Sequence, residues 1–272
     1  MAAFALTALV LGGCQKMDQP ALGDFPKDTN PPDGPLRLYA AMDGTSSDNL
    51  RNGVDSILAL FPSVNGMTQT DGISGKAFQG VDKTAILYPA ANGFGAATSF
   101  SLSIWLKANH TSRAEFIFSV VDQSVGWPKN SIFLMAEQGT DTDVALKLFI
   151  LDQWLAWEGD HKFNYPLTDN NWHHLGIVYD QSTSLVTWYF DGNPVANAPA
   201  SVTEVKNAGA PRGALNLSGA RSFIVGGTNQ HVSVEGATDD WMKSFTGSVD
   251  QVRVYATALS ASDIKTLFDT KK

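Results

Sequence analysis

The feature that most limits the fold of this chain is a strict two-residue alternation of apolar and polar side chains. In the segment SFSLSIWLKA, residues 99–108, the apolar residues Phe100, Leu102, Ile104 and Leu106 alternate with serine, tryptophan and lysine. Successive side chains of a strand point to opposite faces of a sheet. The pattern therefore predicts a strand that turns one face toward a core.

Nine further segments are similar short β runs, and turn residues separate them. They are residues 36–42, 83–89, 115–121, 131–137, 144–151, 172–180, 185–192, 222–227 and 245–255. Asp-Gly or Asn-Gly pairs begin at Asp43, Asn65, Asp71 and Asp191, and such pairs favour tight turns. About ten strands without alternating helices predict an all-β, antiparallel two-sheet sandwich.

Two helices are expected outside the sheets. Apolar residues at helical spacing across residues 50–61, before a proline, predict a short helix. Near the C-terminus, Ser260 is placed as an N-cap, with Asp263 at the capping-box position and Leu259 positioned to pack on Ile264. A short C-terminal helix should follow.

Charge and cysteine content exclude several functions. The formal net charge is −8, with 19 basic and 27 acidic residues and no run of Lys or Arg, so the chain offers no footprint for nucleic acid. The single cysteine, Cys14, cannot form an intramolecular disulfide, and a thiolate zinc site is excluded as well.

The N-terminal segment predicts export. Residues 1–13 are uncharged, apolar or small, too few for a helix across a bilayer but suited to a signal peptide. The sequence LGGC, ending at Cys14, resembles the lipobox of bacterial lipoproteins, which implies that Cys14 becomes the acylated N-terminus. The polar tract after it resembles that of surface-exported lipoproteins in Gram-negative glycan-uptake systems. The expected location is the outer membrane, at the cell surface.

The next segment, residues 14–35, has five prolines between positions 20 and 35 and almost no periodic apolar pattern. It predicts a tether, which at ~3.1 Å per residue can extend to roughly 60 Å. The folded domain is then expected over residues 36–272.

Seven motifs of this domain resemble, in their order, the laminin-G-like concanavalin A-type domains of bacteria. They are LYAAMDG, DGISGKAFQG, FSLSIWLKA, NNWHHLGIVYD, WYFDGNPV, FIVGG and FTGSVDQVRVYATALSASDI. The resemblance covers roughly residues 36–268 and implies a jelly-roll sandwich. This fold hosts lectins, adhesive modules and glycan hydrolases, so it does not decide between them.

The sequence argues against catalysis. Retaining glucanases of this fold carry E-x-D-x-x-E on one strand, which aims the carboxylates into one cleft. In WEGDHKF, Glu158 and Asp160 are present, but Phe163 stands where the acid should be. Glu137 and Asp141 lie in an expected turn without a third partner, and no G-x-S-x-G elbow occurs.

One calcium ion is the only cofactor expected. Alternation places Asp250 on the face of Val252 and Val254, where an ionised carboxylate needs a partner. The family resemblance implies a calcium site where the first and last strands meet, with Asp250 and Asp43 as ligands. The alternative is that Asp250 only accepts backbone hydrogen bonds. His173 and His174, neighbours on one strand, cannot bind one ion together and are expected to be structural.

Four tryptophans are candidate glycan-binding residues. Trp127, Trp154, Trp157 and Trp241 stand beside Gly, Pro, Asp and Asn, as at loop tips, whereas the other three lie within strand patterns. Sugars combine apolar faces with polar edges, so a flat aromatic beside short polar groups suits them. If residues 154 and 157 share a strand, their odd spacing puts them on opposite faces. The alternative for each tryptophan is loop packing.

Together these features predict a lipid-anchored surface protein that binds polysaccharide or oligosaccharide without cleaving it, accessory to glycan capture or uptake. The first alternative is an adhesive or scaffolding lipoprotein with protein partners. The second is a noncanonical glycan hydrolase.

Overall fold

Two sheets packed face to face form the body of the molecule. The computed structural model describes residues 34–44 and 50–271. The larger sheet has eight strands in the order β12-β11-β10-β5-β17-β3-β2, with β1 paired to β17. Its strands are β1 (Leu36–Ala40), β2 (Thr68–Asp71), β3 (Lys76–Gln79), β5 (Phe100–Lys107), β10 (Trp172–Asp180), β11 (Leu185–Phe190), β12 (Asn193–Pro194) and β17 (Ser248–Tyr255).

The second sheet has seven strands in the order β4-β15-β6-β7-β8-β9, with β16 paired in parallel to β6. Its strands are β4 (Ile86–Tyr88), β6 (Ala114–Asp122), β7 (Asn130–Glu137), β8 (Ala145–Ile150), β9 (Gln153–Trp157), β15 (Ala220–Val225) and β16 (Met242–Ser244). A ribbon of β13 (Lys206–Asn207) and β14 (Ala210–Pro211) lies outside both sheets. All ten predicted strand segments are present, and the predicted sandwich is confirmed.

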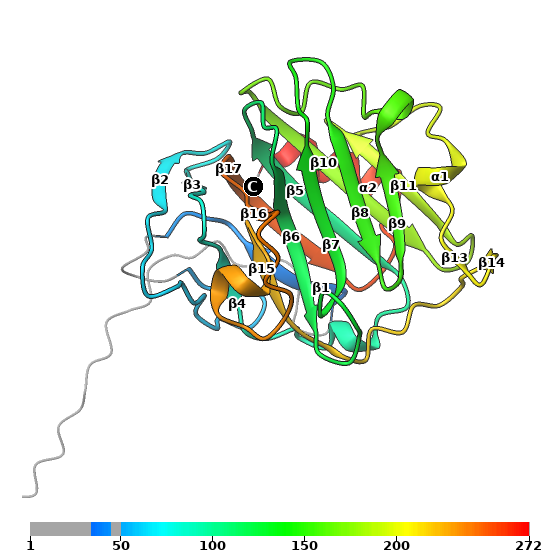
Figure 1. Ribbon diagram of the computed structural model, residues 1–272, viewed down its shortest axis with the longest axis horizontal. Helices are drawn as coiled ribbons and strands as arrows, with labels where there is room; N and C mark the ends of the chain where they lie inside the picture. The colour runs from blue at the N-terminus through cyan, green and yellow to red at the C-terminus, as the bar shows by residue number, and fades with distance from the viewer. Residues whose placement is uncertain (1–33, 45–49, 272) are drawn as a thin grey trace, which may run out of the picture.

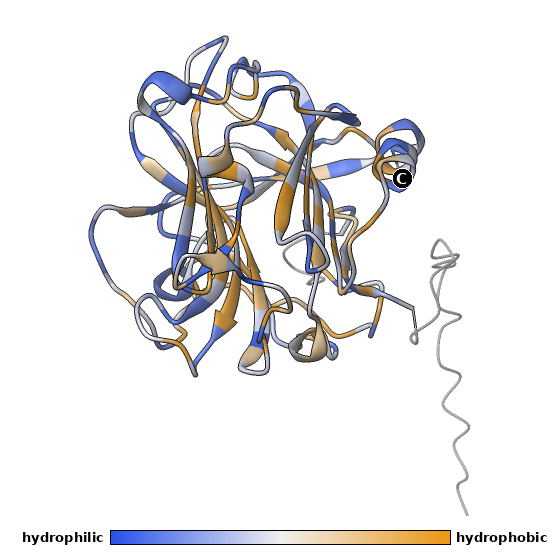
Figure 2. Cartoon of the chain, turned by 90° about the vertical axis from the view of Figure 1, so that its right-hand side faces the viewer, coloured by the Kyte–Doolittle hydropathy of each residue, from blue (hydrophilic) through white to orange (hydrophobic). Residues whose placement is uncertain are grey.

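The core lies between the two sheets, as the predicted alternation requires. Leu102 and Ile104 of β5 face Leu134 of β7, Leu148 of β8 and other apolar side chains in one continuous cluster. Figure 1 shows β6 to β9 in front of the larger sheet, and Figure 2 shows apolar segments concentrated where the layers meet.

The predicted C-terminal helix is α2 (Ala261–Thr270), and it packs on the outward face of the larger sheet. The side chains of Ser260 and Asp263 form the expected capping box, and buried Ile264 shares a cluster with Leu259. The described loops also contain the shorter helical segments η1 (Phe94–Ala96), η2 (Gly159–His161), α1 (Ala200–Thr203) and η3 (Asn229–Val232).

The helix predicted within residues 50–61 is wrong. The described residues of this stretch form isolated bridges instead, between Arg51 and Leu58 and between Leu60 and Leu87. The Asn52 side chain accepts hydrogen bonds from the backbone N–H of Tyr39 and Val54, which ties the segment to β1. Such side-chain to backbone bonds compete with helix formation.

The predicted orientation of Asp250 is also wrong. A β-bulge between Asp250 and Arg253 adds one residue, with Gln251 at a φ of 49°. Val249 and Val252 therefore both reach the core, while Asp250 pairs with Trp105 on the outward face.

The predicted signal peptide, Cys14 and nearly all of the tether lie outside the described residues. Within residues 34–44 and 50–271, no helix has the length and apolar character needed to cross a membrane.

Candidate functional site

Three of the four candidate tryptophans lie together on the outward face of the smaller sheet. The ring of Trp127 is 6.5 Å from that of Trp154 and 6.1 Å from that of Trp241, and each pair is inclined by 33°. Their exposed fractions are 49%, 39% and 45% respectively. We call this group the tryptophan platform.

Buried phenylalanines support the platform from below. Phe116, Phe133 and Phe149 come from the neighbouring strands β6, β7 and β8, and all three are buried. Trp154 meets Phe133 and Phe149 edge-on, at 5.1 and 5.4 Å, and Trp241 lies 5.7 Å from Phe116. The indoles therefore rest on a fixed layer.

Two loops and one strand bring the platform together. Trp154 belongs to β9, whereas Trp127 lies in the loop between β6 and β7, and Trp241 lies just before β16. The indole N–H of Trp127 donates to the Asp239 carboxylate at 2.8 Å, which joins the two loops. The sequence alone does not reveal the role of Asp239, because this residue is remote from Trp127 along the chain.

Trp157 is not part of the platform. It lies in the core, 6% exposed, with edge-on contacts to Phe163 at 5.6 Å and Trp188 at 6.1 Å. Because β9 is extended, Trp154 and Trp157 do point to opposite faces, as their spacing predicts. The assignment of Trp157 to a loop rim is wrong.

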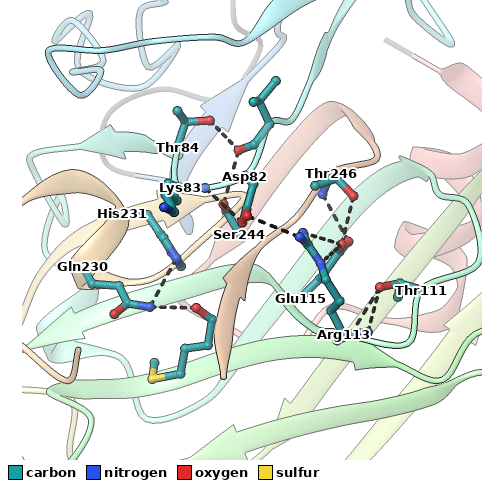
Figure 3. A network of polar contacts seen from close by, with 12 residues as sticks. Asp82, Lys83, Thr84, Thr111, Arg113, Glu115, Gln230, His231, Ser244 and Thr246 are labelled. Carbon is teal, nitrogen blue, oxygen red and sulfur yellow. Dashed lines mark hydrogen bonds and ion pairs between the residues drawn. The ribbon is translucent and has the colours of Figure 1, made fainter. Parts of the chain in front are cut away.

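A polar hollow of about 230 Å³ adjoins the platform, since its lining includes Asp240 and Met242, the neighbours of Trp241. Figure 3 shows Asp82, Lys83 and His231 at this hollow. The Gln230 amide donates to the Met242 carbonyl at 2.7 Å and so holds the strand that follows Trp241.

The buried carboxylate of Glu115 holds together a network of charges near the hollow. Glu115 accepts hydrogen bonds from Arg113 and from the Thr246 hydroxyl, and Arg113 also pairs with Asp82 at 3.3 Å (Figure 3). Burial lowers the pKa of His231 to about 4, so its ring is neutral at pH 7. The hollow therefore offers neutral and charged hydrogen-bonding groups beside an aromatic surface.

Three charged residues lie on the same outward face, nearer the other end of the strands. The Lys147 ammonium is 2.6 Å from a Glu137 oxygen and 2.8 Å from a Glu158 oxygen. Partial burial alone would lower the pKa of Lys147, but the two carboxylates outweigh it and raise that pKa above 10.5. We call these residues the ion triad. Glu137 and Glu158 lie in separate segments of the sequence, so the sequence alone does not reveal that Lys147 joins them.

The ion triad does not have the arrangement of a glycosidase. In retaining enzymes the glycosidic bond lies between two carboxyl groups about 5 to 5.5 Å apart. Here the Lys147 ammonium fills the space between the two carboxylates. Asp141 pairs instead with exposed His110 at 2.6 Å, and Phe163 is buried in the core.

The two candidate calcium ligands hold one loop, that between β2 and β3. One Asp250 oxygen accepts from the backbone N–H of Ile73 at 2.8 Å and of Ser74 at 3.3 Å, and an Asp43 oxygen accepts from that of Lys76 at 2.8 Å. A Cβ at Gly72 would overlap the Asp250 carboxylate, so glycine permits this close approach.

One oxygen of the Asp250 carboxylate is in a position to bind a cation. Its second oxygen is buried and has no hydrogen-bond partner among the described residues. Burial, with a smaller effect from the charge of Asp43, raises the pKa of Asp250 to about 7. Calcium prefers carboxylate and backbone oxygens, so the donor types fit. No group of three or more His, Cys, Asp or Glu that suits a metal occurs in the described part of the chain, and backbone carbonyls would have to complete the shell.

The adjacent histidines point in opposite directions, as predicted. His173 stacks on Phe190 at 4.8 Å, whereas His174 lies 5.4 Å from Trp105 on the outward face of the larger sheet. His173 bonds to Asp191 at 2.9 Å and Asp169 at 3.1 Å. Neither histidine reaches the platform.

Comparison with known proteins identifies a family. Residues 80–265 match the model Laminin_G_3, described as the concanavalin A-like lectin/glucanases superfamily. A search of curated proteins gave no match.

Several solved structures share the fold. Domain 4 of AbnA, a GH43 extracellular arabinanase from Geobacillus stearothermophilus solved with arabinotriose, has a TM-score of 0.55 and 18% identity over 85% of this chain and 97% of its own. Botulinum neurotoxin type C, in a study of its interaction with two ganglioside molecules, has a TM-score of 0.56 and 14% identity over 87% and 51%. A Trypanosoma rangeli sialidase has a TM-score of 0.56 and 16% identity over 87% and 33%.

Proposed function

Since this chain belongs to the concanavalin A-like lectin/glucanases superfamily, we propose that it is a non-catalytic carbohydrate-binding protein. The observation that carries the proposal is the tryptophan platform. Three half-exposed indoles from separate segments meet on one outward face, above buried phenylalanines. The arabinanase domain was solved with arabinotriose and the neurotoxin interacts with gangliosides, so sugar binding has precedent in this fold.

The chemistry of the platform suits a sugar. The apolar C–H face of a sugar ring packs on an indole, while its hydroxyl edge needs donors and acceptors nearby. Trp154 and Trp241 have no hydrogen bond from their indole N–H to another described residue, so both donors are available. The polar hollow beside Trp241 supplies further groups, from Asp240 to His231.

The arrangement of the carboxylates in this chain favours glycan binding without cleavage. The E-x-D-x-x-E motif is missing, and Lys147 stands between the two glutamates of the ion triad. The platform is therefore proposed as a binding surface, with a noncanonical hydrolase as the weaker alternative. If the protein released reducing sugars from a polysaccharide that it binds, the hydrolase alternative would be supported instead.

The decisive experiment compares platform variants by affinity electrophoresis in gels that contain plant, algal, fungal or host glycans. Trp154→Ala should weaken retention by roughly 1 to 3 kcal/mol, by analogy with aromatic stacking on bases. Trp154→Phe keeps an aromatic ring and should retain part of the affinity. Leu185→Ala is the control, because Leu185 is 40% exposed on the other sheet.

Two results would contradict the proposal. One is a wild-type protein that no glycan retards. The other is unchanged retention of Trp154→Ala and Trp241→Ala on every glycan that wild type binds. Either result would favour the alternative of a protein-binding adhesive module.

The anchor is a separate part of the proposal. We propose that Cys14 carries lipid, that residues 14–35 are a tether, and that the domain is presented at the outer membrane surface for glycan capture or uptake. The support is the lone cysteine behind Leu11-Gly12-Gly13. Cys14→Ser in the precursor should abolish incorporation of labelled palmitate and membrane partitioning, and persistence of both would contradict the anchor.

We also propose one structural calcium ion at Asp250, with Asp43 as a second carboxylate. The ion would supply positive charge to a buried oxygen that lacks a donor. Asp250 would bind through that oxygen, while its other oxygen continues to hold the loop between β2 and β3.

A further inference from the structure

The ion triad and the tryptophan platform share one face of the sheet, and the strand register fixes their relation. Phe149 of β8 pairs with Trp154 of β9, and Lys147 pairs with Ala156 two residues further along. The side chains of such alternate residues point to the same face. At roughly 3.3 Å per residue, Glu158 follows Trp154 by about 13 Å. The two groups therefore form one continuous strip.

One small residue separates the platform from the charges on β9. Ala156 lies between Trp154 and Glu158 along this strand and opposite Lys147 of β8. Its side chain does not project far from the sheet, so a ligand stacked on Trp154 can continue toward the ion triad. The Glu158 side chain is 56% exposed, whereas those of Glu137 and Lys147 are 20% and 17% exposed.

The end of the strip that holds the ion triad carries a negative net charge. Two carboxylates share one ammonium, so the ion triad alone carries a formal charge of −1. The nearby ammonium of Lys162 is already paired with Asp143 at 3.1 Å. Asp160, two residues after Glu158, is exposed and has no ion pair among the described residues. Among the described residues, the two lysines at the ion triad, Lys147 and Lys162, are thus both engaged with carboxylates and do not offer a free charge to an anionic ligand.

Resting on the proposed function, we propose that the ion triad is a second subsite that restricts the protein to neutral glycans. Glutamate only accepts hydrogen bonds and lysine only donates them, while a sugar hydroxyl does both. Neutral sugars can therefore bridge all three groups. A uronate or sulfated sugar would bring a like charge against Glu137 and Glu158, which costs binding energy.

The test uses one glycan with and without charge. The probes are a neutral polysaccharide that wild type retains and its carboxymethylated derivative, compared in low-salt affinity gels. Wild type should bind the neutral form at least fivefold more tightly. The double variant Glu137→Gln/Glu158→Gln should bring that ratio close to one, and salt should reduce the discrimination of wild type by screening.

Controls separate a local effect from net charge and from misfolding. Asp269→Asn makes the same kind of change in an exposed pair with Lys265 on α2, and it should keep the wild-type ratio. Glu158→Gln alone should lower the ratio partly, and because Glu158 is largely exposed this variant should fold.

The outcomes distinguish the two proposals. Equal binding of both probes by wild type, preference for acidic glycans, or an unchanged ratio in the double variant would overturn the neutral subsite while leaving glycan binding intact. A wild type that retains no glycan would remove both. Loss of affinity in Trp154→Ala with an unchanged ratio would assign discrimination to the ion triad and affinity to the platform.

Discussion

The two outward faces of the sandwich both carry tryptophans, but these tryptophans are buried on one face and half-exposed on the other. On the larger sheet, Trp105 is 2% exposed and stacks on Phe268 of α2 at 5.4 Å with an interplanar angle of 17°. On the smaller sheet, Trp127, Trp154 and Trp241 remain between 39% and 49% exposed. Within residues 34–44 and 50–271, helix α2 covers one face, whereas the tryptophans of the other face stay half-exposed.

This difference shows which face is available to a partner. Ile264 of α2 is fully buried against Val178 and Tyr189, so the helix completes the covered face as a second small core. No described segment does this for the tryptophan platform. Clustered exposed aromatics on a soluble domain commonly mark binding sites, and the comparison therefore supports the platform over the covered face.

The largest expected effect comes from replacing a tryptophan on the covered face. Trp105→Ala should lower the free energy of unfolding by about 3 to 5 kcal/mol, since it leaves a cavity beneath α2. Trp154→Ala should lower it by less than about 1 kcal/mol, because much of its ring already faces solvent. Urea unfolding of both variants measures the contrast.

Two outcomes would break this contrast. If Trp154→Ala destabilises the protein as much as Trp105→Ala, the platform is a packing element rather than a binding surface. If Trp105→Ala leaves stability unchanged, α2 does not contribute to the covered face as the stacking geometry requires.

Much of this contrast could be predicted from sequence, because it depends on local patterns. Period-two alternation identified the ten main strands, and the capping box of Ser260 and Asp263 identified α2. Strand patterning also separated Trp105 and Trp188, which are buried, from the three platform residues. These features depend on near neighbours in the chain.

The failures depend on residues that are distant in sequence. Asn52 binds the backbone of β1 and prevents the predicted helix, and the bulge at Gln251 reverses the face of Asp250. The rim position predicted for Trp157 is wrong because the sequence pattern of residues 153–157 does not mark β9 as a strand. Lys147 was a visible signal, a lone cation within an apolar strand, but its two glutamate partners come from other segments.

An intermediate effect concerns Asp250. This residue lies on the outward side of the larger sheet and binds the loop between β2 and β3, which covers the Asp250 side chain. Its pKa is raised from 3.8 to about 7 by burial, so in the absence of calcium the native state retains a proton that the unfolded state loses. The contribution of Asp250 to stability should therefore be greatest below pH 4 and decrease as pH rises to about 7. At pH 8 with chelator, Asp250→Asn should exceed wild type by about 1 to 3 kcal/mol.

Calcium should reverse this order. A ligand that binds only the native state stabilises it, so millimolar calcium should raise the melting temperature of wild type at pH 8 but not that of Asp250→Asn. Asp269→Asn is the control and should respond like wild type. An absence of any calcium response in wild type, with no bound metal by elemental analysis, would leave Asp250 as a hydrogen-bonding residue only.

The smallest expected effect concerns His173 and His174, neighbouring residues of β10 at the border of the covered face. Their pKa values shift in opposite directions. Burial lowers the pKa of His174 beside Trp105 to about 4, and the ring is neutral at pH 7. Burial alone would also lower the pKa of His173, but Asp191 and Asp169 outweigh it and raise that pKa above 6.5. Both ring nitrogens of His173 face carboxylate oxygens, an arrangement that the doubly protonated ring satisfies.

The two histidines should therefore respond to pH with opposite signs. The stabilisation from His173 is complete below pH 6.5 and is lost as pH rises through its folded-state pKa, whereas that from His174 is lost as pH falls from 6.5 toward 4. His173→Gln should cost about 1 kcal/mol at pH 6 and less at pH 9, as expected for a partly exposed ion pair. Unfolding at the two pH values, with an NMR titration of both rings, measures this. A cost that is the same at both pH values, or a His173 ring that titrates below 6.5, would show that stacking on Phe190 rather than charge holds this residue.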